Sequence, residues 1–447
     1  MKQDIHSQLL DEAADSAAGA TTTHFRWVIC ALLFFATTIN YMDRQIIGVL
    51  KPTLQTELGW NEIAYSHIVF AVQVAYAGGQ LLAGRMMDRF GVRIGYAVAV
   101  LGWSLAAMGH GLARSVAGFC AARFALGVTE GGNFPAAIKT VTEWFPKRER
   151  ALATGIFNAG SNVGAMVTPL VVPLLAARWG WPAAFYFTGA MGLLWIVPWL
   201  IWYRRPEAHP RVSRAELARI QADPDAAAGA PADRDLPRES WLQVAFRKPT
   251  LAYVLAGMLT GPVWWFYLFW VPDFLNKKHG LNLLQIGLPV AVIYLMADVG
   301  SIGGGWISSH LIRRGWSVNA ARKSAMLLCA LAVVPVFFAS ITSHMWIAVV
   351  LIGLAAAAHQ GWSANLYTFV SDTTPQRSVA SVVGIGGLVG GLAGMAVAKI
   401  VGYVLEFTGS YYTLFVAASS MYLIGLLIIQ LLVPKIEAPR TRAALMN

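Results

Sequence analysis

Charged residues are scarce in this sequence. Asp, Glu, Lys and Arg make up 13% of its 447 residues, against about 25% in an average soluble domain. A soluble globule of this size needs more charge to cover its surface, so the composition argues against a cytosolic enzyme, a nucleic-acid-binding protein and a disordered scaffold. Because hydrophobic residues make up 57% of the chain, the composition indicates a membrane protein.

Cysteine and the motifs of enzyme sites are scarce as well. Cys30, Cys120 and Cys329 lie far apart in apolar stretches, which indicates neither a disulfide framework nor a metal cluster. The sequence shows no nucleophile and base constellation, no metal-ligand spacing and no Gly-rich nucleotide loop. We therefore expect a protein that is not an enzyme and that needs no metal and no cofactor.

Long apolar runs are what the sequence does have. A bilayer core about 30 Å thick needs about 20 helical residues to cross it. Twelve apolar runs of that length, broken by charges or turn residues, cover residues 25–50, 62–84, 92–112, 115–140, 149–176, 182–204, 249–272, 284–311, 320–341, 343–373, 376–406 and 410–435. The polar, acidic residues before Phe25 lack the pattern of a cleaved signal peptide, so the first run predicts a helix of the mature chain.

The basic residues predict how these spans are oriented. The formal net charge is +11, with 34 Lys and Arg against 23 Asp and Glu. With the N-terminus in the cytoplasm, most of the basic residues fall in cytoplasmic tails and loops. Those that fall outside are Lys51, Arg114, Arg178, Lys277 and Lys278. This bias predicts that both termini are cytoplasmic, and the scatter of the charge over short loops argues against nucleic acid as a partner.

One long polar stretch divides the chain. Residues 205–248 contain five prolines, an Ala-rich middle and clustered charge, which is typical of a tether between two bundles. We therefore expect a cytoplasmic tail, a six-helix bundle, a cytoplasmic linker, a second six-helix bundle and a second cytoplasmic tail. Their predicted limits are 1–24, 25–204, 205–248, 249–435 and 436–447.

The two predicted bundles share faint repeats. Gly160 and Gly164 match Gly390 and Gly394 at an offset of 230 residues, and the run that begins at Gly84 has a counterpart that begins at Gly305. Repeated halves are common in secondary transporters, whose binding site lies near the midplane between the halves. Generic helix packing through glycines is the alternative explanation.

The run Gly84-x-x-x-Asp88-Arg89-x-Gly91-x-Arg93 resembles the signature loop of the major facilitator superfamily. The resemblance implies an all-α membrane protein in which twelve transmembrane helices form two pseudo-symmetric six-helix bundles. It also implies a gating role for Asp88, Arg89 and Arg93. Asp88 at a helix end can pair with basic residues and helix termini of neighbouring helices, and this contact must break when the inside gate opens.

Further motifs resemble the anion:cation symporters, a family of organic-anion carriers. These motifs are Asn40-Tyr41-Met42-Asp43-Arg44, the run from Arg123 to Pro135, and Glu143-Trp144-Phe145-Pro146. Gly261-Pro262-Val263-Trp264, Ala297-Asp298-Val299-Gly300 and Ala358-His359-Gln360 are similar to positions in the hexuronate-transporting members. Ser161-Asn162 stands where several members have a Gln-containing pair. The resemblance implies a monomeric proton symporter of the inner membrane that imports a sugar-acid anion such as glucuronate or galacturonate.

Charges inside the predicted spans indicate a functional site, because burying a charge in a bilayer is costly. Six of these charges are singled out, and they are Asp43, Arg44, Arg123, Glu130, Asp298 and Lys399. Lys399 lies near the outer end of its predicted span, where snorkelling to the interface is favoured. A guanidinium matches a carboxylate in a bidentate fork, so Arg44 and Arg123 are the predicted anion clamp. Arg123 and Glu130 are seven positions apart, and so share one face of a helix.

The two buried acids are the predicted proton-coupling groups. Burial favours the protonated carboxyl and a nearby arginine favours the carboxylate, so Glu130 is our first candidate and Asp43 our second. Asp43, Arg44, Arg123 and Glu130 carry no net charge when both acids are ionised. Protonation of both acids raises their net charge to +2, which favours binding of an anion. The alternative is a permanent ion-pair network that joins the first and fourth spans.

Other polar and aromatic residues at mid-depth are candidate substrate ligands, through hydroxyl hydrogen bonds or stacking on a sugar ring. They are Tyr76, Ser161, Asn162, Trp264, Asp298, His359, Gln360 and Asn365, with Trp265 and Trp362 as further aromatic candidates. Packing or lipid contact is the alternative for each aromatic residue.

The sequence thus favours a proton-coupled symporter that imports a hexuronate, with the anion, protons and membrane lipid as its partners. A carrier of galactonate or of another organic anion is the first alternative. An exporter or proton antiporter is disfavoured because two buried arginines favour an anion, although the same fold supports one. A membrane-embedded sensor is disfavoured because the tails are short.

Overall fold

The computed structural model describes residues 23–60, 62–221, 240–281 and 283–436, and these are helical and contain no strand. The first half comprises α2 (Phe25–Leu58), α3 (Glu62–Phe90), α4 (Val92–Leu112), α5 (Val116–Glu130), α6 (Asn133–Trp144), α7 (Lys147–Trp179) and α8 (Pro182–Trp202). The linker contains η1 (Pro206–Ala208), α9 (Arg214–Gln221) and α10 (Trp241–Ala245). The second half comprises α11 (Lys248–His279), α12 (Leu283–Arg313), α13 (Val318–Val333), η4 (Val334–Ser340), α14 (Met345–Thr373), η5 (Gln376–Ser378), α15 (Val379–Thr408) and α16 (Tyr412–Leu432).

Most of these helices are long and apolar enough to cross a membrane. Ten of them meet this condition among the described residues, or eleven if the bent α11 counts as one span. The two parts of α11, Lys248–Tyr267 and Trp270–His279, meet at 47°. Pro272 lies in α11 just after this bend, and a proline removes a helical hydrogen bond and crowds the preceding turn. The chain is therefore a multi-pass membrane protein.

The predicted span over 115–140 is not one helix but two, α5 and α6. The helix breaks at Gly131 and Gly132, and Pro135 in the first turn of α6 has no N–H to continue the ladder from α5. A Cβ at Gly131 would overlap the backbone of Gly79 and Gln80 in α3. The break thus brings the end of α5 against α3, and it places Glu130 at the last position of α5.

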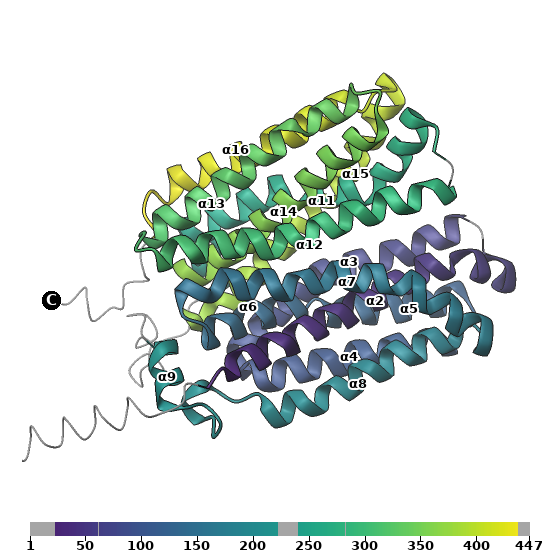
Figure 1. Cartoon of the computed structure of the whole chain (residues 1–447). Coiled ribbons are helices and arrows are strands. Elements are labelled where there is room, and N and C mark those ends of the chain that lie inside the picture. Colours follow the sequence, from purple (N-terminus) through teal and green to yellow (C-terminus); the bar gives the residue numbers. More distant parts are fainter. Residues whose placement is uncertain (1–22, 61, 222–239, 282, 437–447) are drawn as a thin grey trace, which may run out of the picture.

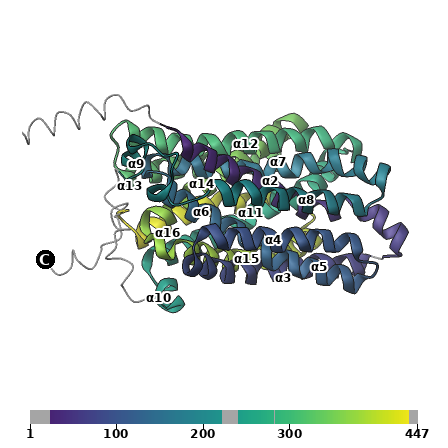
Figure 2. The same ribbon diagram turned by 90° about the horizontal axis from the view of Figure 1, so that it is seen from below.

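The helices gather into two groups that face each other. Figure 1 shows α2 to α8 on one side and α11 to α16 on the other, and Figure 2 shows the same molecule turned by 90°. Across the interface α7 packs against α12, and α3 packs against α15. A Cβ at Gly84 would overlap Ala380 of α15, and a Cβ at Gly305 would overlap Ala151 of α7. The repeated runs that begin at Gly84 and Gly305 therefore make corresponding contacts between the halves.

The linker between the halves is more ordered than a tether over its first part. Glu216 of α9 is fully buried and accepts hydrogen bonds from the backbone N–H groups of Phe25 and Arg26, at 3.0 and 3.1 Å. The Arg26 guanidinium donates to the same carboxylate at 2.9 Å. Negative charge is favourable at a helix N-terminus, so α9 is fixed to the start of α2. We call this side of the molecule, which also holds the end of α16 (Figure 1), the linker end.

Candidate functional site

The centre of the site is an ion pair between α2 and α5. The Arg44 Nε donates to Glu130 Oε2 at 2.9 Å, and Glu130 is fully buried whereas the Arg44 side chain is 18% exposed. The Arg44 guanidinium also lies over the ring of Tyr76, 4.0 Å from its centroid, and 5.0 Å from that of Tyr41. Two aromatic faces and one carboxylate therefore hold a cation that still reaches accessible space.

Asp43 and Arg123 lie on the same two helices as this pair, α2 and α5, and are both buried. Arg123 Nη1 donates to the backbone carbonyl of Asp43 at 3.5 Å. Within the described residues, two atoms of each side chain have no hydrogen-bond partner. These are both carboxylate oxygens of Asp43, and the Nε and Nη2 of Arg123. The two predicted arginines are thus held differently, because Arg44 pairs with an acid and Arg123 with a main-chain oxygen.

The buried polar atoms without a partner concentrate around these helices. Besides those of Asp43 and Arg123, they include both amide atoms of Asn40, Arg44 Nη2 and Glu130 Oε1, judged over the residues that the structure describes. Buried polar groups are ordinarily hydrogen-bonded, and each exception calls for an explanation. Here the spare N–H donors of two arginines match the oxygens of an anion, and the spare carboxylate oxygens match protons.

A chain of amide hydrogen bonds crosses between the halves at mid-depth. Asn162 of α7 donates to Asp298 of α12 at 2.8 Å. Gln360 of α14 bonds Asn162 at 3.4 Å and accepts from Asn158 of α7 at 2.8 Å. Asn158 also donates to Ser301 of α12 at 3.2 Å. Three predicted ligands, Asn162, Asp298 and Gln360, thus lie together and contact each other.

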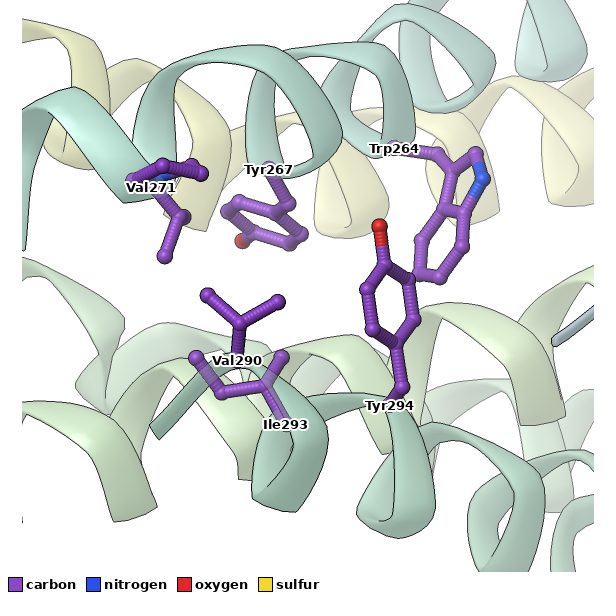
Figure 3. Close-up of a pocket in the computed structure, with 7 residues that line it drawn as sticks. Trp264, Tyr267, Val271, Val290, Ile293 and Tyr294 are labelled. Carbon is purple, nitrogen blue, oxygen red and sulfur yellow. The ribbon is translucent and has the colours of Figure 1, made fainter. Parts of the chain in front are cut away.

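Aromatic side chains form the wall contributed by the second half. Trp264 of α11 stacks on His359 of α14 with ring centroids 5.3 Å apart, and His359 Nδ1 lies 2.6 Å from the hydroxyl of Tyr422. Trp264 also lines a pocket between α11 and α12, together with Tyr267 and Tyr294 (Figure 3). The remaining lining residues are Val271, Pro272, Val290 and Ile293. This wall offers ring faces and phenol hydroxyls rather than charge.

Other predicted residues make the contacts given below within their own half of the molecule. Asn365 is fully buried and donates to the carbonyls of Gly304 and Gly361, both at 2.9 Å, so it joins α12 to α14 inside the second half. Ser161 is buried and bonds the carbonyl of Asn158 in its own helix. Trp362 is fully buried against Tyr422, and the side chain of Lys399 lies outside the described residues.

Asp88 makes a contact between the halves at the linker end. Its Oδ2 accepts a hydrogen bond from the backbone N–H of Ser381 in the first turn of α15, at 2.7 Å. Its Oδ1 accepts from Lys139 of α6 at 2.6 Å. A carboxylate that caps a helix N-terminus is a charge-assisted contact, so Asp88 ties the two halves together in this conformation.

A second contact of this kind lies between α7, α13 and α14. Asp372 accepts from Arg322 at 2.9 Å and from Arg150 at 3.3 Å, and Arg322 donates to the carbonyl of Lys147 at 2.6 Å. Arg150 and Lys147 belong to the first half, whereas Asp372 and Arg322 belong to the second. The halves are thus joined at the linker end by two separate charged clusters.

The other predicted gate residues point away from the interface between the halves. Arg89 is exposed beside Phe90, and Arg93 donates to the carbonyl of Leu200 in its own half, at 2.7 Å. Sequence reasoning missed Lys139 and Asp372. Each lies one residue from the end of a predicted span, 115–140 for Lys139 and 343–373 for Asp372. A charge so near a helix end can reach the interface, so depth gave no signal for either.

The described residues contain no group of three His, Cys, Asp or Glu side chains that could hold a metal ion. The arrangement instead offers a central cation with an acid partner, neutral hydrogen-bonding groups opposite, and charged clusters at one end. It can bind an anion between the halves and exchange protons at buried carboxylates.

We compared the chain with protein families, with proteins of known function and with solved structures. The pattern of the Major Facilitator Superfamily matches residues 33–398. The chain is 31% identical over 406 residues to the hexuronate transporter of Escherichia coli (strain K12), covering 90% of this chain and 93% of that one. It is 29% identical over 418 residues to the D-galactonate transporter of Escherichia coli O6:H1, covering 92% and 96%. The solved structure of a proton:xylose symporter bound to 6-bromo-6-deoxy-D-glucose is similar, with a TM-score of 0.76, 14% identity, and 94% and 98% of the chains covered.

Proposed function

Because the chain belongs to the major facilitator superfamily, whose members are transporters and not enzymes, we propose that it is a proton-coupled symporter that imports a sugar-acid anion. D-glucuronate and D-galacturonate are the proposed substrates, because the chain is 31% identical to a hexuronate transporter. An aldonate such as galactonate is the alternative, favoured by the relative named for that substrate. No cofactor other than the coupling proton is proposed.

The observation that carries the proposal is the Arg44 and Glu130 ion pair, with its partly exposed cation. An incoming carboxylate competes with Glu130 for the Arg44 guanidinium, because both offer the same oxygens to one fork of donors. Protonation of Glu130 removes that competition. Asp43, whose main-chain carbonyl accepts from Arg123, supplies a second buried carboxyl. Proton uptake and anion binding then favour each other, which is the coupling that a symporter needs.

The membrane arrangement is part of the proposal. We propose twelve spans, with α5 and α6 together forming the fourth, in bundles over 25–204 and 249–435. The tails 1–24 and 436–447 and the linker 205–248 then face the cytoplasm, as the basic residues indicate. The protein acts as a monomer in the inner membrane. Asp88 and Asp372 join the halves at the linker end, and we propose that the site opens toward the outside in this conformation.

Uptake into proteoliposomes tests the proposal. The purified full chain is reconstituted, and radiolabelled galacturonate uptake is measured with and without an inward proton gradient, with galactonate as competitor. We expect accumulation above the equilibrium level only with the gradient. Uptake that ignores the gradient contradicts proton coupling, and an absence of uptake and of exchange contradicts the whole proposal.

A further inference from the structure

Asp298 is an acid of the second half, whereas the two arginines belong to the first half. It lies on α12, is partly exposed, and accepts a hydrogen bond from Asn162 of α7 at 2.8 Å. Among the described residues it has no ion pair, so nothing on its own wall neutralises its charge. The groups next along the chain of hydrogen bonds are the amides of Asn162, Gln360 and Asn158, which are neutral.

Helix α7 contacts both the helix that carries Arg44 and the helix that carries this acid. On one side α7 packs against α2 so closely that a Cβ at Gly164 would come within 2.9 Å of Tyr41 Cβ, and Tyr41 lies beside Arg44. On its other side α7 contacts α12 through Asn162. The central site therefore has a cationic pole on α2 and α5 and an acidic pole on α12.

We propose that Asp298 makes the site selective for sugar acids with one carboxylate, and that it rejects aldarates, which carry a carboxylate at each end. This inference rests on the proposed function. The substrate carboxylate binds at Arg44, and the far end of the sugar approaches Asp298. A carboxylate accepts hydrogen bonds from sugar hydroxyls, whereas a second substrate carboxylate there faces a like charge and leaves its own oxygens without donors.

A purely structural role for Asp298 predicts a different result. If Asp298 only holds α12 to α7 through Asn162, then replacing it by Asn alters the binding of every sugar acid alike. If Asp298 repels a second carboxylate, the same replacement improves binding of the diacid relative to the monoacid. The ratio of two inhibition constants separates the two roles, because a general loss of affinity cancels in it.

Competition against galacturonate uptake in proteoliposomes measures this ratio. The competitors are unlabelled galacturonate, galactonate and galactarate. Galactonate and galactarate are both open-chain acids and differ at one end, where a CH₂OH group replaces a carboxylate. For the wild type we expect the inhibition constant of galactarate to be at least about ten times that of galactonate. The ratio of these two constants is the quantity compared between variants. For Asp298→Asn we expect the ratio to fall by about tenfold, and for the exposed Glu57→Gln, which removes the same charge elsewhere, we expect no change.

A second variant keeps the inference testable if Asp298→Asn is inactive. Asn162→Asp adds an acid beside Asp298, and we expect it to raise the ratio of galactarate to galactonate inhibition constants. Equal inhibition by the two acids in the wild type, or a ratio that neither variant changes, overturns the inference. If no sugar acid is taken up or competes in the wild type, the proposed function fails instead.

Discussion

Arg44 donates a hydrogen bond to Glu130 across 2.9 Å, from the middle of α2 to the last residue of α5. The pair spans two helices, and Glu130 sits where a predicted single span breaks. A substrate carboxylate that replaces Glu130 at Arg44 leaves Glu130 buried and without its partner, and burial then favours the protonated acid. The relationship links anion binding to proton binding through one shared cation.

Glu130→Gln removes the proton site and keeps its size. We expect the variant to lose uphill accumulation of substrate driven by a proton gradient, while it keeps substrate exchange across the membrane. Counterflow in proteoliposomes measures exchange, and uptake under an imposed gradient measures coupling. Glu143→Gln is the matched control, because Glu143 is bonded to Tyr203 at the linker end rather than placed at Arg44. Accumulation at the wild-type level by Glu130→Gln would show that another group carries the proton.

Arg44→Lys keeps the positive charge but loses the planar fork and the stack on Tyr76 and Tyr41. Hydrogen bonds to charged groups contribute about 1.5–3 kcal/mol, so we expect the KM for the sugar acid to rise about tenfold or more. Initial uptake rates over a range of substrate concentrations give this value. Arg178→Lys, at an exposed end of α7, serves as the control. An unchanged KM would place the anion elsewhere.

Asp88→Ala removes the carboxylate that caps α15 from the other half. Loss of a helix cap costs about 1 kcal/mol, so we expect about a fivefold shift toward conformations open at the linker end. Spin labels at Phe90 and Arg314, both exposed at the linker end, report this opening as a longer distance. Asp88→Asn retains an acceptor and should shift the population less. Identical distance distributions in all three proteins would contradict a gating role for Asp88.

Glu216 gives a prediction for pH. Burial raises the pKa of this carboxyl, but hydrogen bonds from Thr23, from the backbone of Arg26 and Phe25, and from the Arg26 guanidinium lower it to a net value below its usual range. The Glu216 carboxyl therefore has a lower pKa in the folded protein than in the unfolded chain, where it is about 4.3. The ionised carboxylate stabilises the folded protein at pH values above about 4.3. This stabilisation is lost as the pH falls through the folded-state pKa.

We therefore expect Glu216→Gln in detergent to have a lower Tm than the wild type at about pH 6. The difference should shrink as the pH falls to about 3, because acid protonates Glu216 in the wild type and has nothing to protonate in the variant. Thermal unfolding followed over this pH range gives both curves. Curves that stay parallel would mean that the Glu216 carboxylate does not contribute through its charge.

Much of the architecture follows from the sequence because it depends on local patterns. A long apolar run specifies a helix wherever it lies, since backbone hydrogen bonds must close within the segment in a membrane. The predicted run 92–112 matches α4 at both ends. The run 115–140 does not form one helix, because the consequence of Gly131 and Gly132 depends on how closely α3 approaches them. That distance is a property of packing.

Part of the candidate site could be predicted from the sequence, and part of it could not. Sequence alone identified Arg44 and Glu130 as charges inside predicted spans, since the position of a charge within an apolar run can be read without knowing its partner. It did not identify Lys139 as the partner of Asp88, or Asp372 as the acid that joins Arg150 to Arg322. It also did not show that the Asn365 amide donates to Gly304 and Gly361 within one half.

The sequence by itself determined that this protein crosses a membrane many times, which family it resembles, and which side chains are too polar for their depth. Only the tertiary structure decided that Glu130 pairs with Arg44 rather than with Arg123 on its own helix, and that Asp298 lies against Asn162. The reason is physical. Hydropathy and periodicity act within one segment, whereas an ion pair or hydrogen bond forms between segments and depends on how the helices, and finally the two halves, pack.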